Sequence, residues 1–176
     1  MGSRLSIPEA NYDRILAHLL RNDSDEEEAG FVLATHNIAS QLIALDYLDW
    51  YPIPPDGFAV QSQGYIELTD ECRADVIKRA HDLGAALVEL HSHPWQRRPR
   101  FSPSDLSGLD EFVPHIMWRL KNRPYAAVVV SPAGFDALIW THDPKTAELL
   151  TEIRVGTRTL RPTGLTLTEK EYVYDD

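Results

Sequence analysis

The chain has 176 residues, of which 17 are Lys or Arg and 27 are Asp or Glu, so its formal net charge is −10. This length and its 43% hydrophobic content are typical of one globular domain and exclude disordered or fibrous classes. No segment approaches the roughly 20 apolar residues of a membrane-spanning helix. The acidic balance argues against nucleic acid as a partner, because such binding relies on Lys and Arg.

Cys72 is the only cysteine, which excludes intrachain disulfides and all-cysteine zinc sites. Any metal must therefore be held by His and carboxylate side chains. The N-terminus also lacks the apolar segment of a secretory signal. We therefore expect a cytoplasmic protein with no membrane association.

The first third of the chain predicts a helix followed by two strands. Ser6 is a candidate N-cap for an amphipathic helix that ends near Arg21. The apolar segments 29–34 and 41–48 predict two paired strands. Three prolines within 51–57 are incompatible with a central strand and predict a surface insertion that serves binding.

The remaining segments alternate between strand and helix patterns. In chain order they predict a strand over 65–68, a helix from Thr69 or Asp70 to about Asp82, an inner strand over 85–90, a helix through roughly Lys121, a hairpin of strands 125–130 and 135–140, and a helix over 144–153. This order predicts an α/β or α+β fold class with a central sheet. We expect a single domain over 1–176, with its core at about 5–155 and a C-terminal extension, 157–176, of unassigned structure.

Two histidines follow the inner strand at the spacing of metal ligands. Residues two apart in a strand point to the same side, so His91 and His93 direct two imidazoles at one point. Asp105 is the best third ligand, because Pro103 opens a helix whose first turn carries its carboxylate. Ser102 and Asp105 also fit a capping box, so that simpler interpretation stays open. A set of two His and one carboxylate suits Zn²⁺, although other divalent ions use similar ligands.

These motifs resemble the JAMM (JAB1/MPN/Mov34) metalloproteases, whose pattern is Glu, a variable gap, His-x-His-Pro, a loop and Ser-x-x-Asp. The matching segments are 27–30, 91–94 and 102–105, and the resemblance extends from the first helix to about Trp140. The loop 94–101 has one residue more than is common in the family, which a surface loop tolerates. The resemblance implies a single MPN/JAB-like domain of cytidine deaminase-like architecture, with a central mixed β-sheet flanked by helices.

The resemblance also implies a role for each matching residue. His91, His93 and Asp105 would hold Zn²⁺, which activates water and polarises the scissile carbonyl. Glu27 would act as general base and then general acid. Ser102 would donate a hydrogen bond to the oxyanion.

Glu27 has two acidic neighbours, Glu26 and Glu28, so its assignment needs support. In the family the acid usually stands three residues before a strand glycine, which is Gly30 here. Strand alternation also places Glu27 and Glu28 on opposite faces. The alternative is that all three acids form a solvated turn.

The loop after His93 supplies candidates for substrate binding. Trp95, Arg97, Arg98 and Arg100 lie beside the expected metal, and the alternative is a solvated loop with one packed aromatic ring. Glu89 lies on the strand face of His91. It is expected either to orient that imidazole or to face solvent.

Taken together, the resemblance implies a zinc-dependent hydrolase, specifically a deubiquitinase-like metallo-isopeptidase of the bacterial stand-alone JAB type. Its substrate would be a ubiquitin-like protein or its conjugate, cleaved after the C-terminal tail, and E1-like and E2-like enzymes of a conjugation or antiviral defence system would be its partners. A sulfur-carrier or small-peptide processing peptidase is the alternative within the family. A non-catalytic MPN interaction scaffold is the alternative of another class.

Overall fold

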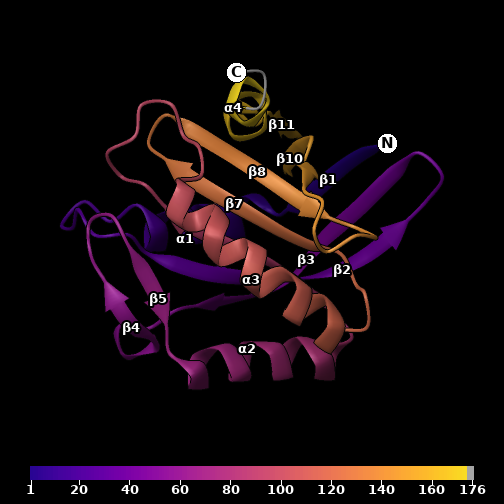
Figure 1. Ribbon diagram of the computed structural model, residues 1–176, viewed down its shortest axis with the longest axis horizontal. Helices are drawn as coiled ribbons and strands as arrows, with labels where there is room; N and C mark the ends of the chain where they lie inside the picture. Colours follow the sequence, from indigo (N-terminus) through magenta and orange to yellow (C-terminus); the bar gives the residue numbers. More distant parts are fainter. Residues whose placement is uncertain (174–176) are drawn as a thin grey trace.

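A mixed nine-stranded sheet organises the chain, in the order β11-β10-β1-β3-β2-β6-β7-β8-β9, and β4 and β5 form a separate hairpin (Figure 1). The computed structural model describes residues 1–173, with side chains placed to residue 169. The strands are β1 (Gly2–Ile7), β2 (Ala29–Ile38), β3 (Leu42–Pro52), β4 (Phe58–Gln61), β5 (Ile66–Leu68), β6 (Ala86–Ser92), β7 (Tyr125–Ser131), β8 (Gly134–Trp140), β9 (Glu148–Leu149), β10 (Glu152–Val155) and β11 (Arg158–Leu160). The helices are α1 (Glu9–Leu19), α2 (Asp70–Leu83), α3 (Pro103–Arg119) and α4 (Leu165–Val173).

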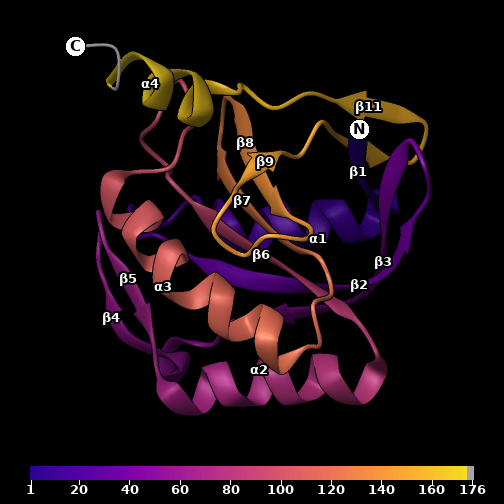
Figure 2. The same cartoon turned by 45° about the vertical axis from the view of Figure 1, so that its right-hand side comes forward.

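Helices cover both faces of the sheet, which confirms the expected fold class. Helix α1 lies on one face and helices α2 and α3 on the other (Figure 2). Along β2 the side chains alternate, so that Phe31 packs with α2 and α3 while Val32 packs with α1. The central strand β6 is buried on both faces, which explains its mostly apolar first half, Ala86 to Val88 with Leu90. None of the helices in the described part of the chain is long and apolar enough to cross a membrane.

The predicted start of the first helix was wrong. Residues Gly2–Ile7 form strand β1, which pairs in parallel with both β3 and β10. Leu5 and Ile7 point into the core, and α1 begins only after Pro8, without a side-chain cap. Ser6 therefore lies in a strand rather than at a helix N-cap. The strands that pair with β1 are distant in the sequence, so no local pattern predicts this pairing.

The predicted helix over 144–153 was also wrong. This segment contains strands β9 and β10, and β10 pairs with β1 and with β11. Ile153 and Val155 alternate into the core, which is a strand pattern that only tertiary pairing reveals. The C-terminal extension thus completes one edge of the sheet with β11 and adds helix α4.

The expected surface insertion over 51–57 is only partly an insertion. Tyr51 and Pro52 end β3, and Ile53 is buried, so the 3-10 turn is limited to Pro55–Gly57. Pro52 is compatible with the strand because β1 pairs only with residues 42–46 of β3, which leaves this end without a neighbour on that side. The predicted pair 29–34 and 41–48 and the hairpin of 125–130 and 135–140 are confirmed.

Candidate metal centre

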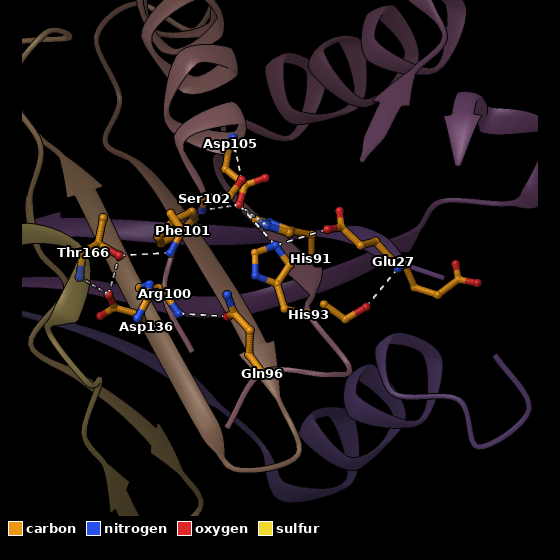
Figure 3. Close-up of polar contacts among 12 residues, drawn as sticks. Glu27, His91, His93, Gln96, Arg100, Phe101, Ser102, Asp105, Asp136 and Thr166 are labelled. Carbon is orange, nitrogen blue, oxygen red and sulfur yellow. Dashed lines mark hydrogen bonds and ion pairs between the residues drawn. The ribbon is translucent and has the colours of Figure 1, made fainter. Parts of the chain in front are cut away.

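Four acidic and imidazole side chains converge where β6 ends beside the first turn of α3 (Figure 3). Glu27, His91, His93 and Asp105 each offer one ligand atom, and these atoms lie within 4.8 Å of one another. Ala29 is paired with His91 across β2 and β6, so Glu27 lies next to the end of β6. The backbone N–H of His93 donates to the carbonyl of Val130 (2.8 Å), which extends the pairing of β6 with β7 beyond Ser92.

The two imidazoles share one carboxylate oxygen. Oδ2 of Asp105 lies 3.2 Å from Nε2 of His91 and 3.2 Å from Nε2 of His93. On the other side, Nε2 of His93 lies 3.2 Å from Oε1 of Glu27. The four groups thus place nitrogen and carboxylate oxygen atoms around a single point.

Several of these buried polar atoms lack hydrogen-bond partners among the described residues. They are Oε2 of Glu27, Nδ1 of His93 and Nε2 of His91. Nε2 of His91 lies 3.2 Å from Oδ2 of Asp105, but the two atoms do not form a hydrogen bond. Unpartnered buried polar atoms are costly and uncommon in native proteins. A divalent cation would satisfy the atoms that face the centre, and the donor set of two imidazoles with carboxylates is one that zinc prefers. The residues therefore fit the metal that the sequence predicts.

The charged groups of the centre shift one another's pKa values in the directions that favour protonated imidazoles beside ionised carboxylates. Burial by itself lowers the pKa of His91, but the Asp105 carboxylate outweighs it and the pKa is raised. For His93, burial also opposes protonation, yet the hydrogen bonds to Asp105 and Glu27 raise the pKa to about 10. Burial by itself raises the pKa of Asp105. The charge of His91, together with the hydrogen bonds from His93 and from the backbone N–H of Ser102, outweighs burial and holds this pKa well below its usual range. The carboxylates thus create an environment that stabilises positive charge.

Ser102 caps α3 and holds the Asp105 carboxylate. Its hydroxyl accepts a hydrogen bond from the backbone N–H of Asp105 (3.0 Å), and its own backbone N–H donates to Oδ2 of Asp105 (2.8 Å). The capping box is therefore present, and it uses the same oxygen that faces both imidazoles. Because the Ser102 hydroxyl acts as an acceptor in the cap, its proton remains available for donation.

Glu27 and Glu28 lie on opposite faces of the sheet, as strand alternation predicts. Glu27 is only 1% exposed, which excludes a solvated turn at this position. Glu28 lies on the α1 side, where its carboxylate is 3.9 Å from both His18 and Arg21. Only Glu27 belongs to the cluster that faces His93.

The backbone of Glu27 is held by the end of β4, which the sequence did not predict. The Gln61 side-chain amide donates to the carbonyl of Glu27 (2.9 Å), and the N–H of Glu27 donates to the carbonyl of Ser62 (3.1 Å). These contacts fix the residue where β2 has not yet begun. The hairpin of β4 and β5 is thus a structural support of the site.

The predicted substrate-binding residues lie in different surroundings. Trp95 is 44% exposed and stacks on the His93 ring, with centroids 5.3 Å apart and planes 20° apart. Arg97 and Arg98 are exposed on the same loop. Arg100 turns to α4, where its guanidinium lies 3.2 Å from the Glu169 carboxylate. Trp95 therefore packs against one predicted metal ligand, and Arg100 contacts the C-terminal helix.

A cavity of about 620 Å³ extends from the centre between α3 and β5. Two of the predicted metal ligands, His91 and Asp105, line it, and Glu89 also belongs to its wall. The Tyr125 hydroxyl donates to Oε2 of Glu89 (2.7 Å), and burial raises the pKa of Glu89. Glu89 is therefore a partner of Tyr125 in the cavity wall and does not point freely into solvent.

Comparisons with known proteins bear on the fold. No family model matches the chain, and no curated protein matches it. The solution structure of protein DSY2949 from Desulfitobacterium hafniense is similar, with a TM-score of 0.56 and 15% sequence identity over 89% of this chain and 94% of that one. At this identity the likeness shows a shared fold and nothing about activity.

Proposed function

We propose that this chain is a zinc-dependent metallo-isopeptidase that hydrolyses the peptide or isopeptide bond after the C-terminal tail of a ubiquitin-like protein. The observation that carries the proposal is the buried cluster of Glu27, His91, His93 and Asp105, with ligand atoms within 4.8 Å of one another. The resemblance to JAMM metalloproteases supplies the reaction and the class of substrate.

Three residues would hold the metal. His91 and His93 present their Nε2 atoms and Asp105 presents Oδ2 to the same point, which leaves a position for water and substrate. Zn²⁺, when bound, makes a water molecule nucleophilic at neutral pH and polarises the scissile carbonyl. The capping box fixes the Asp105 carboxylate before any ion binds.

Two further residues would move protons and stabilise charge. Glu27 stands beside His93 with Oε2 unpartnered, so its carboxylate can accept a proton from water and return it to the leaving amine. The Ser102 hydroxyl, next to Asp105, would donate to the oxyanion as the carbonyl is attacked.

The cavity and the β4–β5 hairpin give room for an extended peptide. The cavity begins at His91 and runs along β5, and the hairpin is a sheet of only these two strands among the described residues. A tail could therefore add a strand beside the hairpin. Trp95, which stacks on His93, and the exposed Arg97 and Arg98 of the same loop would supply further contacts. We place this activity in the cytoplasm, in a system with E1-like and E2-like partners, because the chain needs no disulfide.

The direct test uses fusions of ubiquitin-like proteins to a reporter protein, with mass spectrometry to locate the cut. The zinc-loaded protein is expected to cleave directly after the tail, and the Glu27→Gln variant to bind zinc without cleaving. Glu28→Gln is the matched control, because Glu28 lies on the opposite face. Cleavage of short peptides but of no fusion would instead favour the small-peptide peptidase. A zinc-loaded protein inactive on both would favour the scaffold.

A further inference from the structure

The C-terminal segment is tied to the loop that leads into the metal-ligating helix. Figure 3 shows Asp136 of β8, Thr166 of α4 and the backbone of Phe101 joined by hydrogen bonds beside the centre. These residues are far apart in the sequence. The tie therefore exists only because α4 packs against this loop (Figure 2).

Asp136 is a fully buried carboxylate whose hydrogen bonds hold the start of α4. It is 0% exposed, and Oδ1 accepts from the backbone N–H groups of Ala137 (3.0 Å) and Gly164 (2.9 Å). Its Oδ2 accepts from the N–H of Thr166 (3.0 Å) and from the Thr166 hydroxyl (2.6 Å). A buried charge needs such partners, and a carboxylate is stabilised by the first N–H groups of a helix. Asp136 thereby fixes the Thr166 hydroxyl in one orientation.

The Thr166 hydroxyl also holds the loop that precedes α3. Because it donates to Asp136, its oxygen is directed to accept from the N–H of Phe101 (3.1 Å). The next peptide N–H in the chain, that of Ser102, donates to Oδ2 of Asp105 (2.8 Å). The ring of Phe101 also packs against the His91 ring, with centroids 5.7 Å apart. One backbone hydrogen bond thus lies next to two predicted metal ligands.

A second contact fixes the same loop from the same segment. The Thr163 hydroxyl donates to the carbonyl of Pro99 (2.7 Å), and the N–H of Thr163 donates to the carbonyl of Phe135 on β8 (2.9 Å). Pro99 and Phe101 are therefore held by segment 163–166, which is itself hydrogen-bonded to β8. Their placement depends on a segment outside every motif that the sequence reveals.

We propose that Thr166, anchored by Asp136, is a positioning residue for the metal centre. It holds the Phe101 peptide and so sets the orientation of the Asp105 carboxylate and of the His91 ring. Among the described residues, Thr166 makes hydrogen bonds to Phe101 and Asp136 and to none of the three predicted metal ligands. This inference rests on the proposed function for the existence of the metal centre, and it assigns a role in that centre to the C-terminal extension.

The test compares substitutions at two threonines of α4. Thr166→Val removes the hydroxyl but keeps the shape, and Thr166→Ser restores the hydroxyl. Thr168→Val is the matched control, because the Thr168 hydroxyl is exposed and donates to the carbonyl of Gly164 in its own segment (2.9 Å). Asp136→Asn is a second route to a loosened Thr166 if Thr166→Val does not fold.

Three measurements on the full chain report on the centre. Competition with a chromophoric chelator gives the Zn²⁺ dissociation constant, and the visible spectrum of the Co²⁺-loaded protein reports the ligand geometry. Hydrogen exchange at the Phe101 amide in metal-free protein reports the loop. We expect Thr166→Val to raise the dissociation constant about tenfold, to alter the Co²⁺ spectrum and to speed exchange. Thr166→Ser and Thr168→Val should resemble the wild type.

The possible failures are distinguishable. A Thr166→Val protein that matches Thr168→Val in Zn²⁺ affinity, Co²⁺ spectrum and Phe101 exchange overturns the positioning role, whatever the activity. Wild-type protein that binds neither Zn²⁺ nor Co²⁺ overturns the proposed function instead. In that case, fast Phe101 exchange in Thr166→Val would still show that α4 anchors the loop.

Discussion

Glu27 and His93 face each other with 3.2 Å between Oε1 and Nε2, and both side chains are almost completely buried. Glu27 precedes β2 and His93 follows β6, so the register of these two strands creates the contact. A carboxylate here raises the pKa of His93 and lies beside the predicted metal ligands. The pair is therefore an ion pair at the position where the proposed hydrolysis requires a base beside the metal ligands.

We expect wild-type protein to contain about one zinc ion per chain, because His₂-carboxylate sets hold catalytic zinc in this stoichiometry. The His91→Ala, His93→Ala double variant should contain none, since it loses both imidazole ligands. Elemental analysis after gel filtration measures this. At a zinc concentration of about 100 times the dissociation constant, binding should stabilise the wild type by about 2.7 kcal/mol. Metal-free wild type, even after zinc reconstitution, would contradict the proposed centre.

Glu27→Gln should lower the turnover rate by about 10² to 10⁴-fold, because the amide cannot accept a proton from water. Its zinc content should stay near that of the wild type, since Glu27 is the proposed base and not a ligand. Steady-state kinetics on a cleavable fusion and elemental analysis on the same sample separate the two effects. Loss of zinc together with activity would make Glu27 a fourth ligand instead.

The metal-free protein should lose stability as the pH rises above neutrality. The folded-state pKa of His93 is about 10, above the 6.5 of an ordinary His, so its contribution is fully present below pH 6.5 and is lost as the pH rises through 10. The pKa of Asp105 is lowered, so its contribution is present above its ordinary value of 3.8 and is lost in acid. Melting temperatures with a chelator should therefore fall between pH 6.5 and 10.

Zinc should reverse this trend, because imidazole must be neutral to bind a metal ion. The increase in melting temperature on adding zinc should grow over the same pH interval. The His93→Gln variant, which lacks the titrating group, is the control and should show a flatter profile without metal. An equally steep profile in this variant would assign the pH dependence to other groups.

Two glycines should respond to alanine with opposite signs. A Cβ at Gly30 would meet the Trp50 ring, so Gly30→Ala should destabilise the fold by about 1 to 3 kcal/mol. Gly108 lies within α3 with no atom near its Cβ position, so Gly108→Ala should stabilise the helix by up to about 1 kcal/mol. Urea unfolding measures both. Stabilisation by Gly30→Ala would contradict the packing of β2 against Trp50, and destabilisation by Gly108→Ala would contradict the open space beside α3.

Local patterns were sufficient for several elements and for part of the site. The predicted helix after Thr69 is confirmed, with the Thr69 hydroxyl as cap and Gly84 at its left-handed end, because caps act over a few residues. His91 and His93 share a strand face for an equally local reason. The capping box from Ser102 to Asp105 lies within a single helical turn.

Other features depend on contacts that no local pattern contains. Asp136 is the one charged residue in the otherwise apolar strand β8, which suggests that it has a specific role. The sequence does not show that its partner is Thr166 of α4. Residues Gly2–Ile7 and the segment around β10 form strands because they pair with each other. The local sequence patterns there favour helices instead. Sequence-distant pairing overrides weak local preference in such segments.

The sequence by itself determined the candidate ligand set and the chemistry it favours: two imidazoles at strand spacing, a carboxylate on a first helical turn and a candidate base before a strand. The tertiary structure decided that these groups meet. The register of β2 against β6 brings Glu27 to His93, and the packing of α4 on β8 fixes the loop before Asp105. The physical reason is that residue type and local geometry set what a side chain can do, whereas the distance between sequence-remote side chains is fixed only by strand pairing and packing.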